Sequence, residues 1–381
     1  MSSTIEPFEI PSIPAERLAL LKQKLQNAKY PNELGKEVGW EYGAPRWVVK
    51  PLVEAWLNDY DWEKARAEMN KWHHYRVEIQ NLREHFIHER SSNLDAVPLL
   101  MLNGWPSSFY EYHKVIDSLR DGANGGHAFH VVIASHAGFG FSEAPKLPGH
   151  GGSKSVLGYD DYMVHGSDFG TMVGKWLAVK HPQQCKGFHT ATIALGMDTV
   201  YGRGTSKIKG RSFVDVENDP ELGYCAIQST RPYTLAYGLT DSPVGLLAWL
   251  LEKYHNWSYP ENKDDSVVLP DTITTDEFLT QATLFWLTNS ISSSIRFYYE
   301  TFNDAGVKAV FPLYVNIPSA VSCFPADLSK VPREWLEANF NLQQYNELDM
   351  GGHFPALECG ALLVDEVQRF GKFLKTMEYL K

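Results

Sequence analysis

The sequence predicts an α/β protein with a mostly parallel, doubly wound sheet, an inserted helical lid and an N-terminal helical meander. Three observations support this fold class. Apolar residues recur at helical spacing near the N-terminus, short β-rich runs then alternate with helices, and a long helical stretch interrupts that alternation. Strands that alternate with helices are typical of parallel sheets covered on both faces.

The N-terminal segment reads as a set of helices. Leu18, Leu21 and Leu25 fall on one face of a helix, which Pro31 is expected to stop. A second helix is expected around Trp47–Leu57. Asp61 is a good N-cap residue and predicts the start of a third helix.

The period then changes to that of strands. Tyr75–Ile79 and Glu84–His88 alternate polar and apolar residues around a short turn that contains Asn81, which predicts a hairpin. Further strands are expected at Val97–Leu102, Phe129–Ala134, Tyr162–His165 and Phe188–Ile193. A helix at Met172–Lys180 is expected between the last two of these strands.

Residues 200–305 break the alternation with helix-like, aromatic sequence. The alternation resumes near Leu313, with a last strand around Leu342–Tyr345 and a closing helix at Val364–Leu374. We therefore predict four segments: an N-terminal meander that packs on core and lid (1–90), the first part of the core (91–200), a helical lid (201–305) and the second part of the core (306–381). Ligands of such sheets bind at the carboxyl ends of the strands, here under the lid.

The charge and cysteine content of the chain limit its expected binding partners and its expected location. The formal net charge of −11 argues against nucleic acid and against an anionic membrane surface, both of which call for clustered Lys and Arg. The four cysteines are scattered and form no motif, which favours a reducing compartment. We find no apolar stretch long enough for a signal peptide or a membrane anchor, so a cytoplasmic location is expected. A homodimer is compatible with the sequence.

The most informative residues are Gly166–Gly170. A strand enters, small residues stand two positions to each side of Asp168, and a helix leaves, which is the pattern of a nucleophile elbow. The bulky flanks of Ser167 at the same spacing, His165 and Phe169, exclude Ser167 as the centre of the elbow. The nucleophile would therefore be a carboxylate, although Asp168 would also serve as a simple N-cap.

Two further residues complete a candidate catalytic set. His353 stands on the Gly-rich loop Met350–Phe354 beyond the last expected strand, where it can lie over the elbow as a general base. Asp327 follows an earlier strand and would orient the imidazole, although a helix-capping role is the alternative. The chain order Asp168, Asp327, His353 matches nucleophile, acid and histidine.

The turn Leu102–Pro106 ends an early strand, and in this arrangement it places a backbone N–H beside the nucleophile. We assign the oxyanion hole to the backbone amides of Trp105 and Phe169.

With these residues in place, the sequence resembles the microsomal type of epoxide hydrolase, an α/β-hydrolase-fold family, and especially its soluble fungal members. The resemblance covers nearly the whole chain. NGWPSSFYEY is similar to the family's HGWPGSF-type loop, AGFGFS to its GYGFS turn, GSDFG to its GGDWG elbow and GGHFPALE to its histidine loop.

The resemblance implies two lid tyrosines that hydrogen-bond the epoxide oxygen. Tyr224 matches the first by its STRP context, and Tyr298 matches the second by its place before Glu300. Tyr299, Tyr233 and Tyr237 are the neighbouring alternatives.

The chain also departs from the family pattern. Asn103 replaces a His before the oxyanion-hole residue, which could shift the loop, and Ser167 and Phe169 replace Gly and Trp or Ile at the elbow. His165 is unusual and is interpreted as a packed strand residue, with a second base as the alternative.

The implied reaction opens a small apolar epoxide to a vicinal diol through an ester on Asp168, which water activated by His353 then hydrolyses. It needs no cofactor and no metal, and it requires an ordinary pKa near 4 for Asp168. Two alternatives remain open: a haloalkane or haloacid dehalogenase with the same Asp–His core, and a catalytically silent ligand-binding protein.

Overall fold

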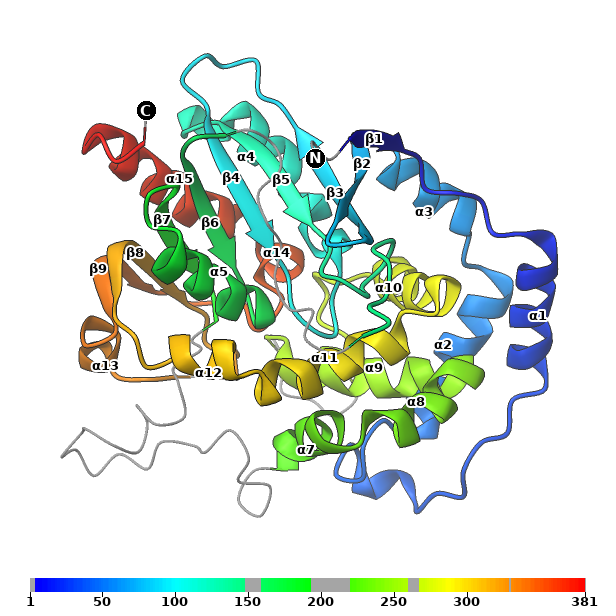
Figure 1. The fold of residues 1–381 in the computed structure, drawn as a ribbon. Coiled ribbons are helices and arrows are strands. Elements are labelled where there is room, and N and C mark those ends of the chain that lie inside the picture. The colour runs from blue at the N-terminus through cyan, green and yellow to red at the C-terminus, as the bar shows by residue number, and fades with distance from the viewer. Residues whose placement is uncertain (1–3, 148–158, 193–219, 260–266, 329, 381) are drawn as a thin grey trace.

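The computed structural model describes residues 4–147, 159–192, 220–259, 267–328 and 330–380. Within these ranges one nine-stranded sheet forms the centre of the molecule, with helices on both of its faces (Figure 1). Further helices lie across one end of the sheet, as expected for a lid, and the N-terminal helices lie beside them. The predicted α/β-hydrolase architecture is confirmed.

The strand order is β1-β2-β3-β5-β4-β6-β7-β8-β9. The strands β4 to β9 pair in parallel, whereas β1, β2 and β3 add an antiparallel edge next to β5. Their bounds are β1 Ile5–Phe8, β2 His74–Ile79, β3 Leu82–Glu89, β4 Val97–Leu102, β5 Phe129–Ala134, β6 Tyr162–Gly166, β7 Cys185–Thr190, β8 Val315–Cys323 and β9 Phe340–Glu347.

The helices complete the layers. Their bounds are α1 Ala15–Gln26, α2 Arg46–Asn58, α3 Trp62–Met69, α4 Ile116–Asp121, α5 Phe169–Lys180, α7 Gly223–Thr230, α8 Pro232–Asp241, α9 Pro243–Trp257, α10 Thr275–Thr288, α11 Ile291–Asn303, α12 Ala305–Val310, α13 Arg333–Glu337, α14 Pro355–Glu358 and α15 Gly360–Thr376. Short 3₁₀ turns occur at η1 Lys36–Val38, η2 Phe109–Lys114, η3 Ala123–Gly125 and η4 Pro220–Leu222.

Most strand predictions are confirmed. The bounds of β4 and β5 agree with the prediction, and the hairpin turn of β2 and β3 has two residues with positive φ, Gln80 and Asn81, as a tight hairpin requires. The strand predicted at Phe188–Ile193 begins at Cys185, and its predicted end at Ile193 lies outside the described residues.

The N-terminal edge differs from the prediction in two ways. The strand β1 was not expected, because it is only four residues long and contains Pro7, which is tolerated on an edge strand. Helix α1 ends at Gln26, before Pro31, where Asn27 bonds back to the carbonyl oxygen of Gln23 through its side chain and its amide. Leu18, expected on the inner face of this helix, is 37% exposed.

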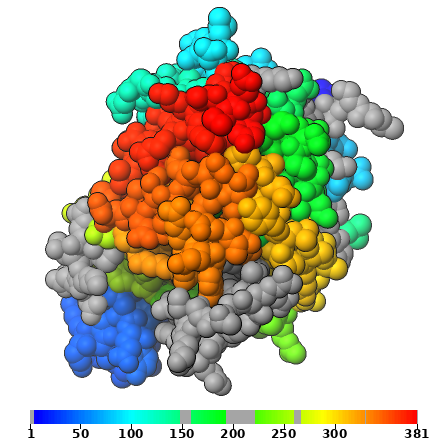
Figure 2. Space-filling view, turned by 90° about the vertical axis from the view of Figure 1, so that its left-hand side faces the viewer, coloured from blue at the N-terminus to red at the C-terminus, as the bar shows by residue number. Residues whose placement is uncertain are grey.

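The core lies on both faces of the sheet. Leu99, Val131 and Met163 pack towards α4 and α15, in one cluster with Phe370. The neighbouring strand positions point to the other face, where Val164 packs with Leu177 of α5. This alternation buries both faces of the parallel strands, which fixes their register. Figure 2 looks onto the β9 edge, where the C-terminal segment, orange to red, forms much of the visible surface.

The N-terminal helices are attached to the lid as well as to the sheet. Helices α1 and α2 contact α9, and α3 contacts α10. The three boundaries between the four predicted segments stay a prediction, and the one at residue 200 lies outside the described residues. In the part of the chain that the structure describes, no helix has the length and apolar character needed to cross a membrane.

Candidate functional site

Asp168 occupies a sharp turn between β6 and α5. Its φ of 49° and ψ of −121° place it in a backbone region that non-glycine residues rarely adopt. A Cβ on Gly166 would lie 2.4 Å from the backbone of Gly170, and one on Gly170 would lie 1.9 Å from the carbonyl oxygen of Leu102. The two flanking positions therefore accept only glycine, and the predicted elbow geometry is present at Asp168.

The carboxylate of Asp168 is held by backbone amides. The Trp105 N–H donates to Asp168 Oδ1 at 2.8 Å, and the Phe169 N–H also donates to this carboxylate. These are the two amides predicted for the oxyanion hole. A Cβ on Gly104 would lie 2.0 Å from Asp168 Oδ1, so the loop approaches the carboxylate closely only because this residue is glycine.

Asn103, which replaces the family's His, leaves this loop in place. It is fully buried, and its side-chain amide donates to the carbonyl oxygen of Gly104 at 2.9 Å. Its own carbonyl oxygen lies 2.6 Å from Nε2 of His136, which donates to it. Asn103 Oδ1 is buried and has no hydrogen-bond partner among the described residues, so only the NH₂ group of this amide is satisfied, yet the Trp105 amide still reaches Asp168.

His353 and Asp327 meet beside the elbow. The Nδ1–H of His353 donates to Asp327 Oδ1 at 2.7 Å, and His353 Nε2 lies 3.8 Å from Asp168 Oδ2. Both side chains are buried. The histidine loop is fastened to the lid, because the amide of His353 donates to the carbonyl oxygen of Trp257 at 2.8 Å. The structure thus brings together the three residues that the chain order suggested.

The charges in this site are strongly coupled. Burial lowers the pKa of His353, but the hydrogen bond and charge of Asp327, with the charges of Asp168 and Glu111, raise that pKa to about 9. Burial raises the pKa of Asp168, which differs from the ordinary value expected from the sequence. The charge of His353 and the two amide donors oppose this shift and favour the carboxylate form.

Two buried carboxyl groups at this site were missed by the sequence reasoning. Burial raises the pKa of Glu111 to about 7, and the charges of both His353 and Asp168 act on it. Burial also raises the pKa of Glu358 to about 7, although Glu358 accepts hydrogen bonds from the amides of Tyr259 and Phe354. Both glutamates stand inside motifs already singled out, but only the fold shows that they are buried.

Tyr224 and Tyr298 come together from two lid helices, α7 and α11. Their hydroxyl oxygens are 3.4 Å apart, both rings are buried, and the charge of Asp168 contributes to raising the pKa of both phenols. The ring of Tyr224 stacks on Trp105 with centroids 5.3 Å apart, and that of Tyr298 meets Phe169 edge-on at 4.5 Å. Burial holds the pKa of each phenol well above its usual value, so both remain hydrogen-bond donors at neutral pH.

The alternative tyrosines face solvent. Tyr299 is 43% exposed, Tyr233 57% and Tyr237 82%. Of the two consecutive tyrosines, Tyr298 faces the site and Tyr299 faces solvent, as expected for neighbouring residues of a helix, so the proposal below keeps Tyr298.

His165 is a packed residue, as interpreted from the sequence. It is fully buried on β6, and its Nδ1 lies 2.8 Å from Nδ1 of His189. His189 Nε2 in turn lies 3.1 Å from the hydroxyl of Ser322. Burial lowers the pKa of both histidines, which disfavours a charged role.

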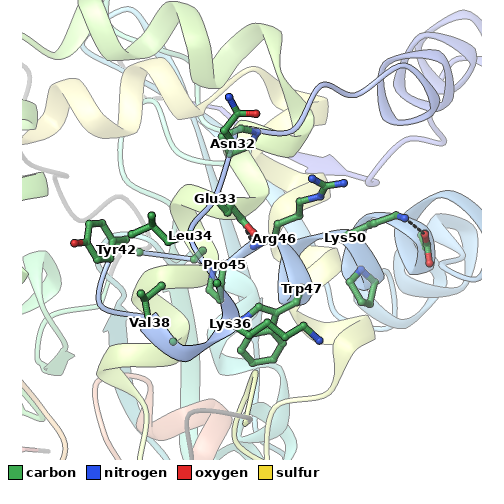
Figure 3. A pocket seen from close by; sticks show the side chains of 17 residues that line it. Asn32, Glu33, Leu34, Lys36, Val38, Tyr42, Pro45, Arg46, Trp47 and Lys50 are labelled. Atoms are coloured by element: carbon green, nitrogen blue, oxygen red, sulfur yellow. Dashed lines mark hydrogen bonds and ion pairs between the residues drawn. The ribbon is translucent and has the colours of Figure 1, made fainter.

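A separate cavity of about 760 Å³ lies in the N-terminal segment, where residues 31–54 line it (Figure 3). Its wall is mixed, with Trp47 and Tyr42 beside Glu33, Arg46 and Lys50. None of the predicted site residues lines it. Among the described residues no cluster of His, Cys, Asp and Glu is arranged to hold a metal ion.

An elbow carboxylate, a histidine–aspartate pair and two phenols over a parallel sheet define an α/β-hydrolase with a carboxylate at the nucleophile position. Comparison with known proteins makes the class specific. The family described as epoxide hydrolase N terminus matches residues 5–112. Epoxide hydrolase 1 of Sus scrofa is 32% identical, over 96% of this chain and 88% of its own.

Two solved structures agree. The juvenile hormone epoxide hydrolase of the silkworm Bombyx mori superposes with a TM-score of 0.83 at 28% identity, covering 98% of this chain and 95% of its own. The Aspergillus niger epoxide hydrolase gives 0.81 at 28% identity, covering 97% of each chain. The chain belongs to the epoxide hydrolase family, and its reaction is the hydrolysis of an epoxide.

The coupling of His353 to Asp327 can be tested by pH titration. In Asp327→Asn, we expect the pKa of His353 to fall from about 9 towards its ordinary value near 6.5, because the strongest raising interaction is lost. The ring proton of His353, followed by NMR, measures this change. Asp349→Asn, which removes an exposed carboxylate in the segment after β9, should leave it unchanged.

The same shift affects stability. A raised folded-state pKa stabilises the protein fully below the unfolded pKa of about 6.5, and this contribution is lost as the pH rises through about 9. Asp327→Asn should therefore flatten the fall in unfolding free energy over that range. An unchanged His353 titration in the variant would contradict the assignment.

Proposed function

We propose that Asp168 opens the epoxide ring by direct attack and forms a covalent alkyl ester. The observation that carries this proposal is the environment of its carboxylate: Oδ1 accepts the Trp105 amide at 2.8 Å, while Oδ2 faces His353 Nε2 at 3.8 Å. One oxygen is thus held in the amide pocket, and the other is available as the nucleophile.

In the first step, Asp168 Oδ2 forms a bond to one ring carbon while the bond from that carbon to the epoxide oxygen breaks. Negative charge develops on the leaving oxygen. Tyr224 and Tyr298 donate hydrogen bonds to that oxygen, and one of the two phenols transfers its proton to it, which leaves a hydroxyl group on the ester and a phenolate on the enzyme. Two neutral donors in a buried site stabilise this charge more strongly than water-exposed donors would, because the local dielectric is low.

In the second step, His353 removes a proton from water, and the resulting hydroxide attacks the ester carbonyl carbon of Asp168. The charge then moves to Oδ1, which already accepts the Trp105 amide, with the Phe169 amide beside the same carboxyl group. Collapse of this intermediate breaks the ester bond, and the departing alkoxide oxygen takes the proton that His353 removed from water and leaves as part of a vicinal diol. The proton of the carboxylic acid left on Asp168 returns to the phenolate, which restores both the carboxylate and the tyrosine.

The electrostatics of the site fit this order of steps. Asp168 is one of the charges that raise the pKa of His353. Esterification neutralises Asp168 and removes that contribution. His353 therefore becomes easier to deprotonate at the stage at which it must act as a base, with Asp327 still holding its orientation.

The walls of the site favour an apolar epoxide. Trp105, Phe169 and Trp257 surround the polar groups with aromatic surface, and Phe297 packs against Phe169 edge-on. Each step uses side chains, backbone amides and water, so the proposal calls for neither metal nor cofactor. Four further expectations stay predictions: that the protein does not bind nucleic acid, that it has no membrane anchor, that it can form a homodimer, and that it is cytoplasmic.

The dehalogenase alternative is less well supported than ester formation from an epoxide. A halide product needs N–H donors beside the nucleophile, and Phe169 has none in its side chain. A silent binding protein is disfavoured because a competent residue stands at each position: the base is hydrogen-bonded to its orienting acid and lies 3.8 Å from the nucleophile, and the two phenols are 3.4 Å apart.

Oxygen isotopes test the covalent step. In a single turnover in H₂¹⁸O, we expect the label to enter the carboxyl group of Asp168, while the first diol carries an unlabelled oxygen taken from Asp168. Mass spectrometry of the diol and of the peptide that contains Asp168 measures both. Asp168→Asn should show no turnover. Label found only in the first diol would mean that water attacks the epoxide directly.

The two phenols are tested by removing their hydroxyl groups. Tyr224→Phe and Tyr298→Phe should each slow ester formation about a hundredfold, and the double variant should be slower than either, because each loses one donor to the developing charge. Tyr299→Phe is a matched control one residue away and should be unaffected. Full activity in the double variant would show that these tyrosines are not the acids.

A further inference from the structure

Lys253 of helix α9 is a buried cation that the reaction scheme has not used. Its side chain is only 2% exposed. Lysine is almost never fully buried without a partner, because desolvating an ammonium group is costly. Its ion pair with Glu252, the preceding residue, supplies one compensating interaction, and Glu252 is 28% exposed.

The ammonium group of Lys253 also lies over aromatic faces. Its Nζ lies over the ring of Tyr224 at 4.7 Å from the centroid, and over the rings of Trp257 and Trp249 at 5.5 and 5.8 Å. All three distances are within the range of cation–π attraction. The shortest of them joins the ammonium group to a phenol that is proposed to act on the substrate.

Two of these aromatic neighbours, Tyr224 and Trp257, connect Lys253 to both halves of the site. Tyr224 stacks on Trp105 and places its hydroxyl 3.4 Å from that of Tyr298. Trp257 stands one helical turn after Lys253, meets the ring of His353 edge-on at 5.0 Å, and accepts the amide of His353. Lys253 could therefore act on ring opening through Tyr224 or on ester hydrolysis through Trp257.

The N-terminal segment packs beside the ion pair of Lys253 and Glu252. A Cβ on Gly43 would lie 3.3 Å from Glu252 Oε2, and Trp40 stacks on His255 of the same helix with ring centroids 3.6 Å apart. A charge enclosed in this way acts on its neighbours through a lower dielectric than a charge in water.

We propose that Lys253 is a positioning residue for epoxide opening, which strengthens Tyr224 as a hydrogen-bond donor by placing a positive charge over its ring. A cation over the ring draws electron density away from the hydroxyl group and makes its hydrogen more positive. The hydrogen bond from this hydroxyl therefore strengthens most when the epoxide oxygen becomes negative. The effect belongs to the first step, because Tyr224 has no part in the attack of water on the ester. The inference rests on the proposed role of Tyr224.

The test uses the full chain and measures the two steps separately. Lys253→Met keeps the length of the side chain and removes its charge, whereas Lys253→Arg keeps the charge. The rate of ester formation on Asp168 is followed by rapid quenching and mass spectrometry in a single turnover, and ester hydrolysis is followed after it. We expect Lys253→Met to slow ester formation about tenfold and to leave ester hydrolysis unchanged, and Lys253→Arg to restore most of the loss.

The decisive comparison places Lys253→Met in two other backgrounds. In Tyr224→Phe, which lacks the hydroxyl, the lysine substitution should cause no further loss, whereas in Tyr298→Phe it should again cost about tenfold. Lys50→Met, at an exposed lysine of α2, is the control for loss of a positive charge and should be neutral. Thermal unfolding identifies folded variants, and Lys253→Gln replaces the Met variant if that one does not fold.

Two results would overturn the inference: an unchanged rate of ester formation in folded Lys253→Met, or an equal loss in the Tyr224→Phe background, which would indicate a purely structural role. Failure of the underlying scheme looks different. In that case Tyr224→Phe itself would form the ester at the unaltered rate, or no ester would form on Asp168 in any variant.

Discussion

The site depends on one interaction above all, the hydrogen bond from the Trp105 amide that holds the carboxylate of Asp168, whose side chain is 17% exposed. Removing a charge from water is unfavourable, and burial accordingly raises the pKa of Asp168. The amides of Trp105 and Phe169 and the charge of His353 oppose that shift. The glycines around Asp168 serve the same end, because any side chain at Gly104 would collide with the carboxylate.

The charges around Asp168 change together during the proposed cycle. In the free enzyme a partly buried carboxylate faces a histidine whose pKa is about 9. Ester formation removes the negative charge of Asp168, and the histidine then gives up its proton more readily. Asp327 keeps its hydrogen bond to His353 throughout, so the base changes its charge without changing its orientation. The same few groups thus serve as nucleophile, counter-charge and base in turn.

Local sequence predicts a feature only when the physical constraint is local. The elbow could be recognised from Gly166 and Gly170, because the backbone itself excludes larger residues there. The pair Tyr224 and Tyr298 could not be derived from spacing, since their helices meet only through the tertiary fold, and the family resemblance was needed. The short edge strand β1, the buried carboxyl of Glu111 and the aromatic contacts of Lys253 gave no sequence signal, because burial by distant segments decides them.

The covalent ester is the central claim, and the most direct measurement is its capture. In His353→Gln the base is missing, while Asp168 and both tyrosines remain, so the ester should form and persist. After incubation with aromatic and aliphatic epoxides, mass spectrometry of the peptide that contains Asp168 should show a mass increase equal to that of one epoxide. A folded His353→Gln protein that still turns over these epoxides, or that carries the increment on another residue, would contradict the account.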